Sequence, residues 1–292
     1  MATISDPLSA QRALLAMYAE DMYNPSQADA LNPPLDVRAS DSWRIVGYLT
    51  AANALFSAQA IQLGERVYFG FLANSIAAPS QYVAVVRGTE SAIEWLENIE
   101  GLLVPHPLAG QVEQGFFSIY QSMRYSPAGA GTLLRAQAEG GVPCAAGIGA
   151  ALPPNAALTV IGHSLGSALG TYLLCDLAQI TPRQFSVDAC LIASPHAGDR
   201  KFVERVDHDA PLYKVYNYIF DIVPHVPPSL PLGLGFQALP KAMWITSNDA
   251  QARIDNNLLC NHHAFSYAAM LDYASVAGVV NPHTKCILRK SG

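Results

Sequence analysis

The segment Gly162-His-Ser-Leu-Gly166 constrains the fold of this chain more than any other feature. An apolar, β-branched run from Leu158 to Ile161 precedes it, and apolar residues at helical spacing follow it from Leu165 to Leu177. This order predicts a strand, a sharp turn and a helix. A side chain at either glycine would collide with the strand or the helix, so the turn holds Ser164 in a strained conformation at the sheet edge. The pattern is typical of a nucleophile elbow, in which the helix N-terminus offers N–H groups to a developing anion.

The composition limits the classes of protein to consider. Of 292 residues, 51% are hydrophobic and 14% are charged, which supports a large buried core. The formal net charge of −6, without any cluster of Lys and Arg, argues against a nucleic-acid partner. No apolar run reaches the roughly 20 residues of a membrane span, so no transmembrane segment is expected. The N-terminal residues lack the basic region and apolar core of a signal peptide, so we expect a cytoplasmic protein or one exported by a signal-independent route.

The cysteines are odd in number and far apart, at positions 144, 175, 190, 260 and 286. None forms a C-x-x-C pair, which argues against zinc ligation. Cys175 lies in the helix predicted after the elbow and Cys190 in a predicted strand, so both are expected to be inert core thiols. A reducing compartment is the simplest fit to this usage, and export remains the alternative.

The rest of the chain alternates predicted strands with predicted helices. Asp6 and Pro7 mark the start of a helix at about 8–22, because Asp is a common N-cap and Pro fits the first helical position. The β-branched and aromatic segments predicted as strands are 44–49, 66–72, 82–87, 187–193, 212–219 and 242–246. The predicted helices are 112–124, 131–139, 199–206 and 263–276, and a Gly-, Pro- and Ala-rich connector spans 140–154. This alternation predicts one α/β domain, residues 1–292, with a mostly parallel central sheet flanked by helices.

An activated serine needs a base, and the base needs a group that holds its tautomer. Asp221 comes directly after a predicted strand, at the end where α/β sheets bind ligands. Its apolar neighbours would strengthen a hydrogen bond to imidazole, and the alternative is an ordinary turn residue. His262 and His263 lie just before the last predicted helix, where a ring reaches the sheet edge, so both are candidate bases.

Three segments carry a resemblance to a known family. Val160–Leu169 is similar to V-x-G-H-S-L-G-G-A-L with one Gly replaced by Ser, Asp221–Pro227 to D-x-V-P-x-x-P, and Asn261–Tyr267 to N-H-x-x-x-x-Y. These patterns are typical of the fungal-type (class 3) lipases of the α/β-hydrolase superfamily, and this chain resembles that family over about residues 80–270. The resemblance implies Ser164 as nucleophile, Asp221 as orienting acid and His262 as base. His263 is the alternative base, and His163 is expected to be structural.

A fourth segment, Val85–Trp95, resembles the family's F-R-G-T/S-x-S-x-x-x-W. The resemblance implies that Thr89 stabilises an oxyanion through its backbone N–H and its hydroxyl. The N–H of Leu165 would be the second donor. The alternative for this segment is a simple turn at the end of a strand.

Residues 90–104 are predicted to form a lid. Trp95, Leu96 and Ile99 share one face of a helix with Ala92 and Leu103, and glutamates lie towards the other face. Directly after an oxyanion loop, such a face is expected to cover the site in water and to contact acyl chains when open. The alternative is an ordinary surface helix.

Two segments depart from the family pattern. Glu113 stands where the family usually has His, and Ser194–Asp199 stands where G-x-P-R-V-G-N is common. Both segments would neighbour the site, so the acyl and leaving-group preference stays open.

The resemblance implies a serine carboxylic-ester hydrolase that acts on lipid esters, a triacylglycerol lipase or esterase, through an acyl-enzyme. A phospholipase A1 and a catalytically silent lipase-like binding module are the alternatives. The implied chemistry requires no metal and no organic cofactor. The expected partners are the lipid ester and, transiently, a lipid–water interface.

Overall fold

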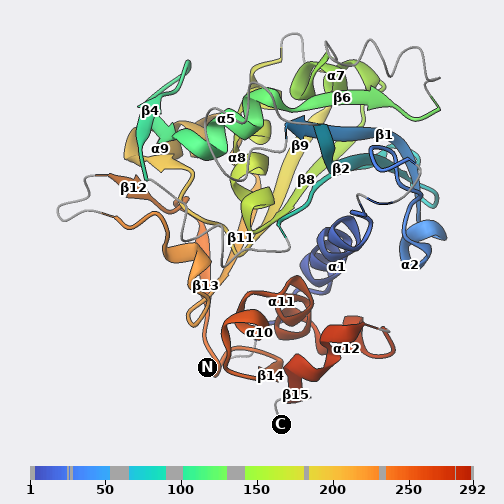
Figure 1. Cartoon of the computed structure of the whole chain (residues 1–292), viewed down its shortest axis with the longest axis vertical. Helices are drawn as coiled ribbons and strands as arrows, with labels where there is room; N and C mark the ends of the chain where they lie inside the picture. Colours follow the sequence, from blue (N-terminus) through green and yellow to red (C-terminus); the bar gives the residue numbers. More distant parts are fainter. Residues whose placement is uncertain are drawn as a thin grey trace.

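The computed structural model describes residues 4–24, 26, 29–52, 66–89, 101–129, 142–180, 184–229, 235–279 and 281–290. Within these residues the central sheet has nine strands (Figure 1). In spatial order they are β13 (Ala242–Ile245), β11 (Tyr213–Tyr218), β9 (Ser186–Ile192), β8 (Ala157–His163), β3 (Gln81–Val86), β2 (Arg66–Ser75), β1 (Trp43–Ala52), β6 (Arg124–Pro127) and β7 (Val142–Pro143).

The sheet is mixed. The strands from β13 to β3 pair in parallel, and those from β3 to β7 pair antiparallel. Because the carboxyl ends of parallel strands meet at one edge, the segments that follow β3, β8 and β11 come together there. These segments carry Thr89, Ser164 and Asp221, respectively.

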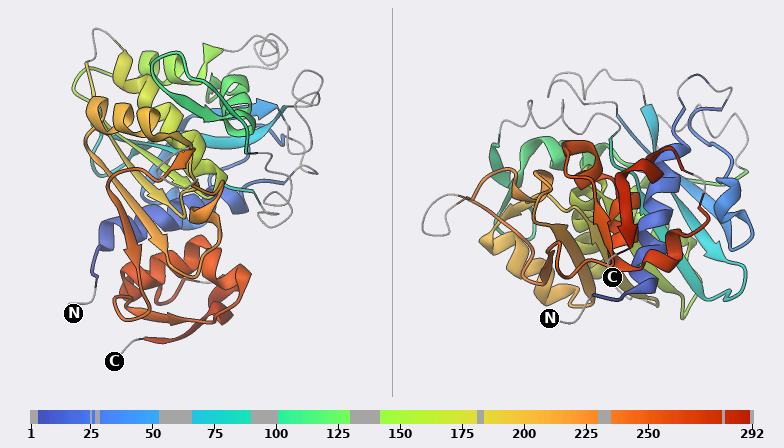
Figure 2. Two further views of the ribbon diagram at one scale, coloured as in Figure 1. Left: turned by 90° about the vertical axis from the view of Figure 1, so that its left-hand side faces the viewer. Right: turned by 90° about the horizontal axis from the view of Figure 1, so that it is seen from below.

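Helices cover both faces of the sheet (Figure 1). The helices α5 (Gln114–Ser122), α7 (Cys144–Ala151), α8 (Leu165–Gln179) and α9 (Arg200–Asp209) bury their apolar side chains in one hydrophobic core. A second core contains side chains of α1 (Pro7–Asp21), α11 (Ala264–Leu271) and α12 (Tyr273–Val276). Val160 of β8 belongs to the first core and Ile161 to the second, as the alternation of side chains along a strand requires. Figure 2 shows the C-terminal helices on the same side of the sheet as α1.

The remaining elements are short. They are α2 (Val37–Ser40), α10 (Leu258–His262), the 3₁₀ turns η2 (Val223–His225) and η4 (Pro282–Cys286), and the strands β4 (Leu103–Pro105), β5 (Gln111–Glu113), β10 (Gly198–Asp199), β12 (Phe236–Gln237), β14 (Ala252–Ile254) and β15 (Ile287–Lys290). Strands β12, β10, β5 and β4 form a second sheet, and β14 pairs with β15. Among the described residues, no helix combines the length and the apolar character that crossing a membrane requires.

The predicted α/β class is confirmed, and so are its main elements. The helix predicted at 8–22 is α1, and Asp6 caps it by accepting the N–H of Ser9 at 3.1 Å. The strand, turn and helix predicted around Ser164 are β8, the turn and α8.

Three element predictions were wrong in part. The helix predicted at 112–124 begins only at Gln114, because Val112 pairs with β4 and β10 as part of β5. The predicted connector at 140–154 contains α7, whose Gly147 lies so close to Tyr125 that an added Cβ would come within 2.7 Å of Tyr125 Cβ. The helix predicted at 263–276 is interrupted at Asp272, whose extended backbone ends α11 and whose side chain caps α12.

The predicted lid is only partly within the described residues. Leu103, predicted on its apolar face, begins β4, which pairs antiparallel with β5, so the helix does not extend to residue 104. Trp95, Leu96 and Ile99 lie outside the described residues, as does the helix predicted at 131–139. The lid therefore stays a prediction.

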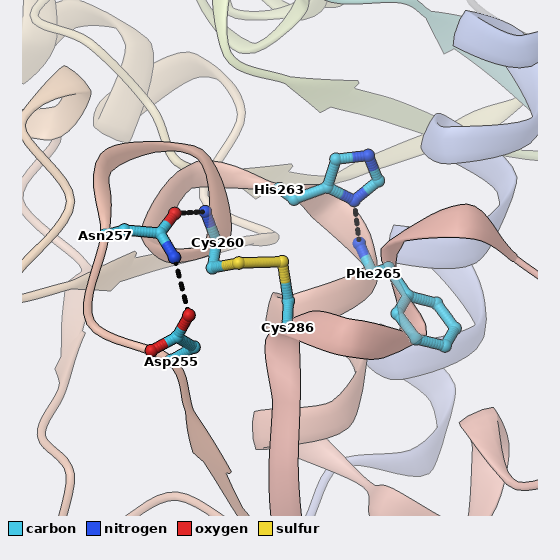
Figure 3. The surroundings of a disulfide bond; sticks show 6 residues. All are labelled: Asp255, Asn257, Cys260, His263, Phe265 and Cys286. Atoms are coloured by element: carbon cyan, nitrogen blue, oxygen red, sulfur yellow. Dashed lines mark hydrogen bonds between the residues drawn. A yellow bond between two sulfur atoms is a disulfide. The ribbon is translucent and has the colours of Figure 1, made fainter.

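A disulfide joins Cys260 of α10 to Cys286, which is 26 residues further along the chain (Figure 3). Asn257 caps α10 by accepting the N–H of Cys260, and its own amide donates to Asp255. The sequence analysis did not identify this pair, because spacing alone does not encode connectivity. Cys175 and Cys190 are buried free thiols, as predicted.

Candidate active site

The turn at Ser164 has the strained geometry that the two glycines predict. Ser164 has φ 58° and ψ −130°, a left-handed conformation that a residue other than Gly rarely adopts. An added Cβ on Gly162 would lie 2.3 Å from the carbonyl oxygen of Gly166, and one on Gly166 would lie 2.2 Å from that of Val86. Glycine is therefore required at both positions, and the backbone N–H of Ser164 donates to Ile192 at 3.0 Å.

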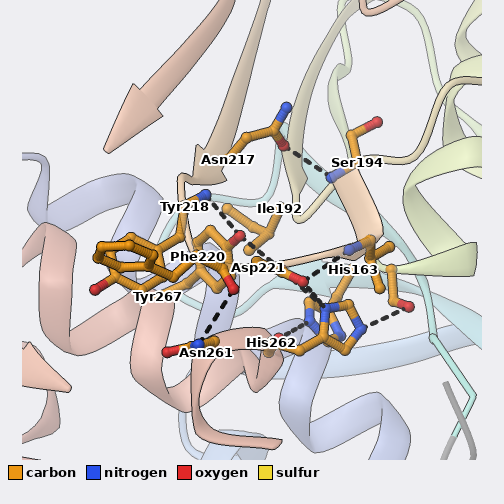
Figure 4. A network of polar contacts seen from close by, with 12 residues as sticks. His163, Ile192, Ser194, Asn217, Tyr218, Phe220, Asp221, Asn261, His262 and Tyr267 are labelled. Atoms are coloured by element: carbon orange, nitrogen blue, oxygen red, sulfur yellow. Dashed lines mark hydrogen bonds and ion pairs between the residues drawn. The ribbon is translucent and has the colours of Figure 1, made fainter. Parts of the chain in front are cut away.

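His262 connects Ser164 to Asp221. Its Nε2 lies 2.8 Å from Ser164 Oγ, and its Nδ1 lies 2.9 Å from Asp221 Oδ2 and 3.1 Å from Oδ1. Figure 4 shows the His262 ring against the Asp221 carboxylate. The Asp221 side chain is fully buried, whereas 12% of the His262 side chain is exposed. This chain of hydrogen bonds is the arrangement in which an imidazole takes the proton of a serine hydroxyl.

The ring of His263, the alternative base, caps a helix. Its Nδ1 accepts the N–H of Phe265 at 3.1 Å, so it caps α11 (Figure 3). The structure thus brings His262 to Ser164 and places the alternative base, His263, at a helix start. The catalytic role of either residue stays a prediction.

Asp221 accepts hydrogen bonds from two residues besides His262. Its Oδ1 accepts the N–H of Val223 at 3.0 Å. Its Oδ2 accepts the hydroxyl of Tyr267 at 2.8 Å, and Figure 4 shows Tyr267 and Asp221. The same hydroxyl accepts the N–H of Tyr218 at 2.8 Å. Burial, together with the Asp221 charge, raises the pKa of Tyr267 well above its usual value, so this hydroxyl stays protonated and donates to the carboxylate. The Tyr that the sequence matched only as part of a motif therefore orients the acid.

The predicted oxyanion donors belong to the two residues that directly follow Gly88 and Ser164 in sequence. Thr89 is buried, and its hydroxyl makes no hydrogen bond with the described residues. Gly88 packs against the elbow so closely that an added Cβ would lie 3.1 Å from Ser164 Cβ, and its carbonyl accepts from Arg87 Nη1 at 2.8 Å. Leu165 is the first residue of α8, so its N–H belongs to the helix-terminal donors that have no intrahelical partner. Free donors at a helix N-terminus are suited to stabilise an oxyanion, and the roles of Thr89 and Leu165 stay predictions.

Glu20 and His163 form a pair next to Ser164, and the sequence analysis predicted a role for only one of them. His163, predicted to be structural, has its Nδ1 2.6 Å from Glu20 Oε1 and its Nε2 2.7 Å from the carbonyl oxygen of His262. Glu20 was not among the predicted residues. No local motif marks a carboxylate near the end of an apolar helix, and only the packing of α1 against the turn reveals its contact.

The two departures from the family pattern keep structural contacts. Glu113 is buried and caps α5, since its Oε2 accepts the N–H of Phe116 at 2.7 Å. In the segment 194–199, Ser194 N–H donates to the side chain of Asn217 (Figure 4), and the ring of His196 contacts the carbonyl of Pro227 at 2.7 Å. No group of three or more His, Cys, Asp or Glu side chains in the described part of the chain is arranged to hold a metal ion.

The parallel strands, the strained turn between β8 and α8, and the acid after β11 define an α/β hydrolase. The family model of Lipase (class 3) matches residues 83–230. Phospholipase A1-II 3 of Oryza sativa subsp. japonica is 31% identical over 256 residues, covering 78% of this chain and 60% of the rice protein. A lipase of Rhizomucor miehei is 27% identical over 206 residues, covering 67% of this chain and 51% of that lipase.

Among solved structures, a triacylglycerol lipase with a serine protease triad as its catalytic centre has a TM-score of 0.54 at 19% identity. The match covers 82% of this chain and 78% of that one, and it supports the fold. The chain belongs to the class 3 lipase family. It spans between about half and 60% of the length of the curated relatives named above.

Proposed function

We propose that this chain hydrolyses the carboxylic ester bond of lipids through an acyl-enzyme on Ser164. The observation that carries the proposal is the unbroken chain of hydrogen bonds from Ser164 Oγ through His262 to Asp221. Each residue type has its required partner, and the Ser164 backbone holds the hydroxyl at the sheet edge.

In the proposed reaction, His262 Nε2 takes the proton of Ser164 as Oγ attacks the ester carbonyl carbon. Thr89 and the N–H of Leu165 hold the oxyanion, and one such donor stabilises a transition state by about 3–4 kcal/mol. His262 then protonates the departing alcohol. Water repeats the sequence and releases the fatty acid, while Asp221 keeps the proton of Nδ1 in place.

An exposed apolar rim beside the triad supports a lipid substrate. We define this rim as Ile219, Phe220, Ile222, Leu258 and Leu259, whose exposed fractions run from 38% to 53%. Phe220 and Ile222 flank Asp221 in sequence, and the carbonyl of Phe220 accepts a hydrogen bond from Asn261, which precedes His262. Exposed apolar side chains on the two segments that carry the candidate acid and base favour an apolar ligand. We propose that the face of Trp95, Leu96 and Ile99 completes this surface as a lid.

Phospholipids and triacylglycerols are the two candidate substrate classes. One relative is a phospholipase A1, and a related structure is a triacylglycerol lipase. Parallel assays of phosphatidylcholine vesicles and triacylglycerol emulsions distinguish them. The higher kcat/KM assigns the substrate class.

The test of the chemistry is Ser164→Ala. Turnover of a p-nitrophenyl ester should fall by a factor of about 10⁴–10⁶, and a fluorophosphonate should label the wild type at Ser164 and leave the variant unlabelled. If correctly folded wild-type protein is not labelled, the chain is a lipase-like binding module and the proposed function is wrong.

The disulfide bears on the compartment. Disulfides persist in oxidising environments, so the Cys260–Cys286 bond favours export over a cytoplasmic location, and we propose export. Fractionation of the producing cells, followed by immunodetection of this chain outside them, tests this proposal.

A further inference from the structure

Glu20 contacts two separate parts of the candidate site from the last turn of α1. Its Oε1 accepts the N–H of Gly88 at 3.2 Å, one residue before Thr89. The same oxygen lies 2.6 Å from His163 Nδ1, and the other ring nitrogen of His163 reaches the carbonyl of His262. One carboxylate and one ring therefore join the oxyanion loop, the elbow and the backbone of the candidate base.

The partners of the His163 ring determine its protonation state. A carboxylate and a carbonyl oxygen only accept hydrogen bonds, so both ring nitrogens must donate. A ring that donates from both nitrogens is an imidazolium. Only 5% of the His163 side chain and 16% of the Glu20 side chain are exposed, so the two charges form a nearly buried ion pair.

We propose that the Glu20–His163 ion pair is a positioning unit, which holds the oxyanion loop and the base in register with Ser164. This inference rests on the proposed ester hydrolysis. The pair does not touch the substrate and acts through Gly88 and His262. The rings of His163 and His262 are 4.7 Å apart between centroids, so the ion pair packs directly against the candidate base. A displacement of about 1 Å at a catalytic group lowers turnover by about 10²-fold. An ion pair that keeps Gly88 and His262 in place therefore has a large effect on turnover.

The pair is ionised over a defined pH range. Burial opposes the charge of His163, but the adjacent Glu20 carboxylate raises the pKa of the ring above its usual 6.5. Burial also opposes the charge of Glu20, but His163 lowers the pKa of that carboxyl below its usual 4.5. The other charges that act on the pair come from His262, His263 and Asp221. The ion pair therefore stabilises the folded protein between the Glu20 pKa and the His163 pKa. This stabilisation is lost as the pH falls through the Glu20 pKa or rises through the His163 pKa.

Glu20→Gln tests the proposal, with Asp21→Asn as the matched control. The amide keeps the shape of Glu20 but removes its charge, so His163 becomes neutral and one of its two donors is lost. Asp21 is the next residue of the same helix and pairs with Arg38 at 2.5 Å, away from the triad. Both variants are assayed on a p-nitrophenyl ester, with active sites counted by fluorophosphonate titration.

For Glu20→Gln we expect kcat per titrated site to fall by about 10–100-fold, with KM changed by less than about twofold. Asp21→Asn should match the wild type. A lower melting temperature without a change in kcat per site overturns the proposal, because a purely structural role predicts that result.

A second measurement uses the wild type and does not depend on how the variant folds. Nitrogen-15 NMR of the histidine rings over a pH series should show protons on both nitrogens of His163 and the loss of one of them only above the usual pKa of 6.5, and a ring that is already mostly neutral at pH 6 overturns the proposal. If the wild type neither reacts with fluorophosphonate nor hydrolyses esters, the proposed function fails while this spectrum still reports on the ion pair.

Discussion

Replacing Tyr267 by Phe removes a hydroxyl that serves two buried hydrogen bonds. It donates to Asp221 Oδ2 at 2.8 Å and accepts the N–H of Tyr218 at 2.8 Å. Tyr267 is fully buried, so the Phe ring fills nearly the same space and the change isolates the hydroxyl.

The magnitude follows from the two bonds. A hydrogen bond to a charged acceptor contributes about 1.5–3 kcal/mol, and a buried N–H left without a partner costs about 1–3 kcal/mol. The free energy of unfolding should therefore fall by roughly 3–5 kcal/mol, which corresponds to a decrease in Tm of about 5–8 °C for a chain of this size. Because Asp221 keeps its contacts with His262 and the N–H of Val223, kcat per titrated site should fall by no more than about tenfold.

The assay is thermal unfolding followed by circular dichroism, paired with ester hydrolysis per fluorophosphonate-titrated site. Tyr82→Phe is the control, because Tyr82 is partly buried and its hydroxyl makes no hydrogen bond with the described residues. If Tyr267→Phe lowers Tm by no more than this control does, the two hydrogen bonds do not have the strength assigned to them.

Three further changes test other parts of the structure. Asp221→Asn should lower kcat by about 10⁴-fold because the amide favours the wrong tautomer of the base; activity within tenfold of the wild type in steady-state kinetics would contradict the triad. Phe220→Ser, in the exposed apolar rim, should reduce hydrolysis of vesicle lipids about tenfold and leave a soluble ester unaffected. Leu212→Ser, at the opposite end of β11 and 66% exposed, is its control and should affect neither. Cys260→Ser opens a disulfide loop of 26 residues and should cost about 3–4 kcal/mol in chemical denaturation, with no further loss when a reductant is added.

Local sequence was sufficient to predict those elements of the fold that depend only on neighbouring residues. The β-branched run before Gly162 and the apolar helical spacing after it predict β8, the turn and α8, because backbone sterics and side-chain periodicity act over a few positions. The same holds for Asp6 as the cap of α1. Local sequence failed at α7, where Gly and Ala predicted a connector, because the packing of Gly147 on Tyr125 stabilises a helix there.

In the candidate site, too, the sequence indicated some residues, whereas other contacts were evident only from the fold. Motif spacing indicated Ser164, Asp221 and His262, and left His263 as an alternative. The fold brings the first three together, and their catalytic roles stay predictions. Only the tertiary structure decided that Glu20 meets His163 across 143 positions of sequence and that Cys260 pairs with Cys286. These contacts arise when α1 and the C-terminal segment pack beside the sheet edge, and their partners are too far apart in the chain for any local pattern to specify them.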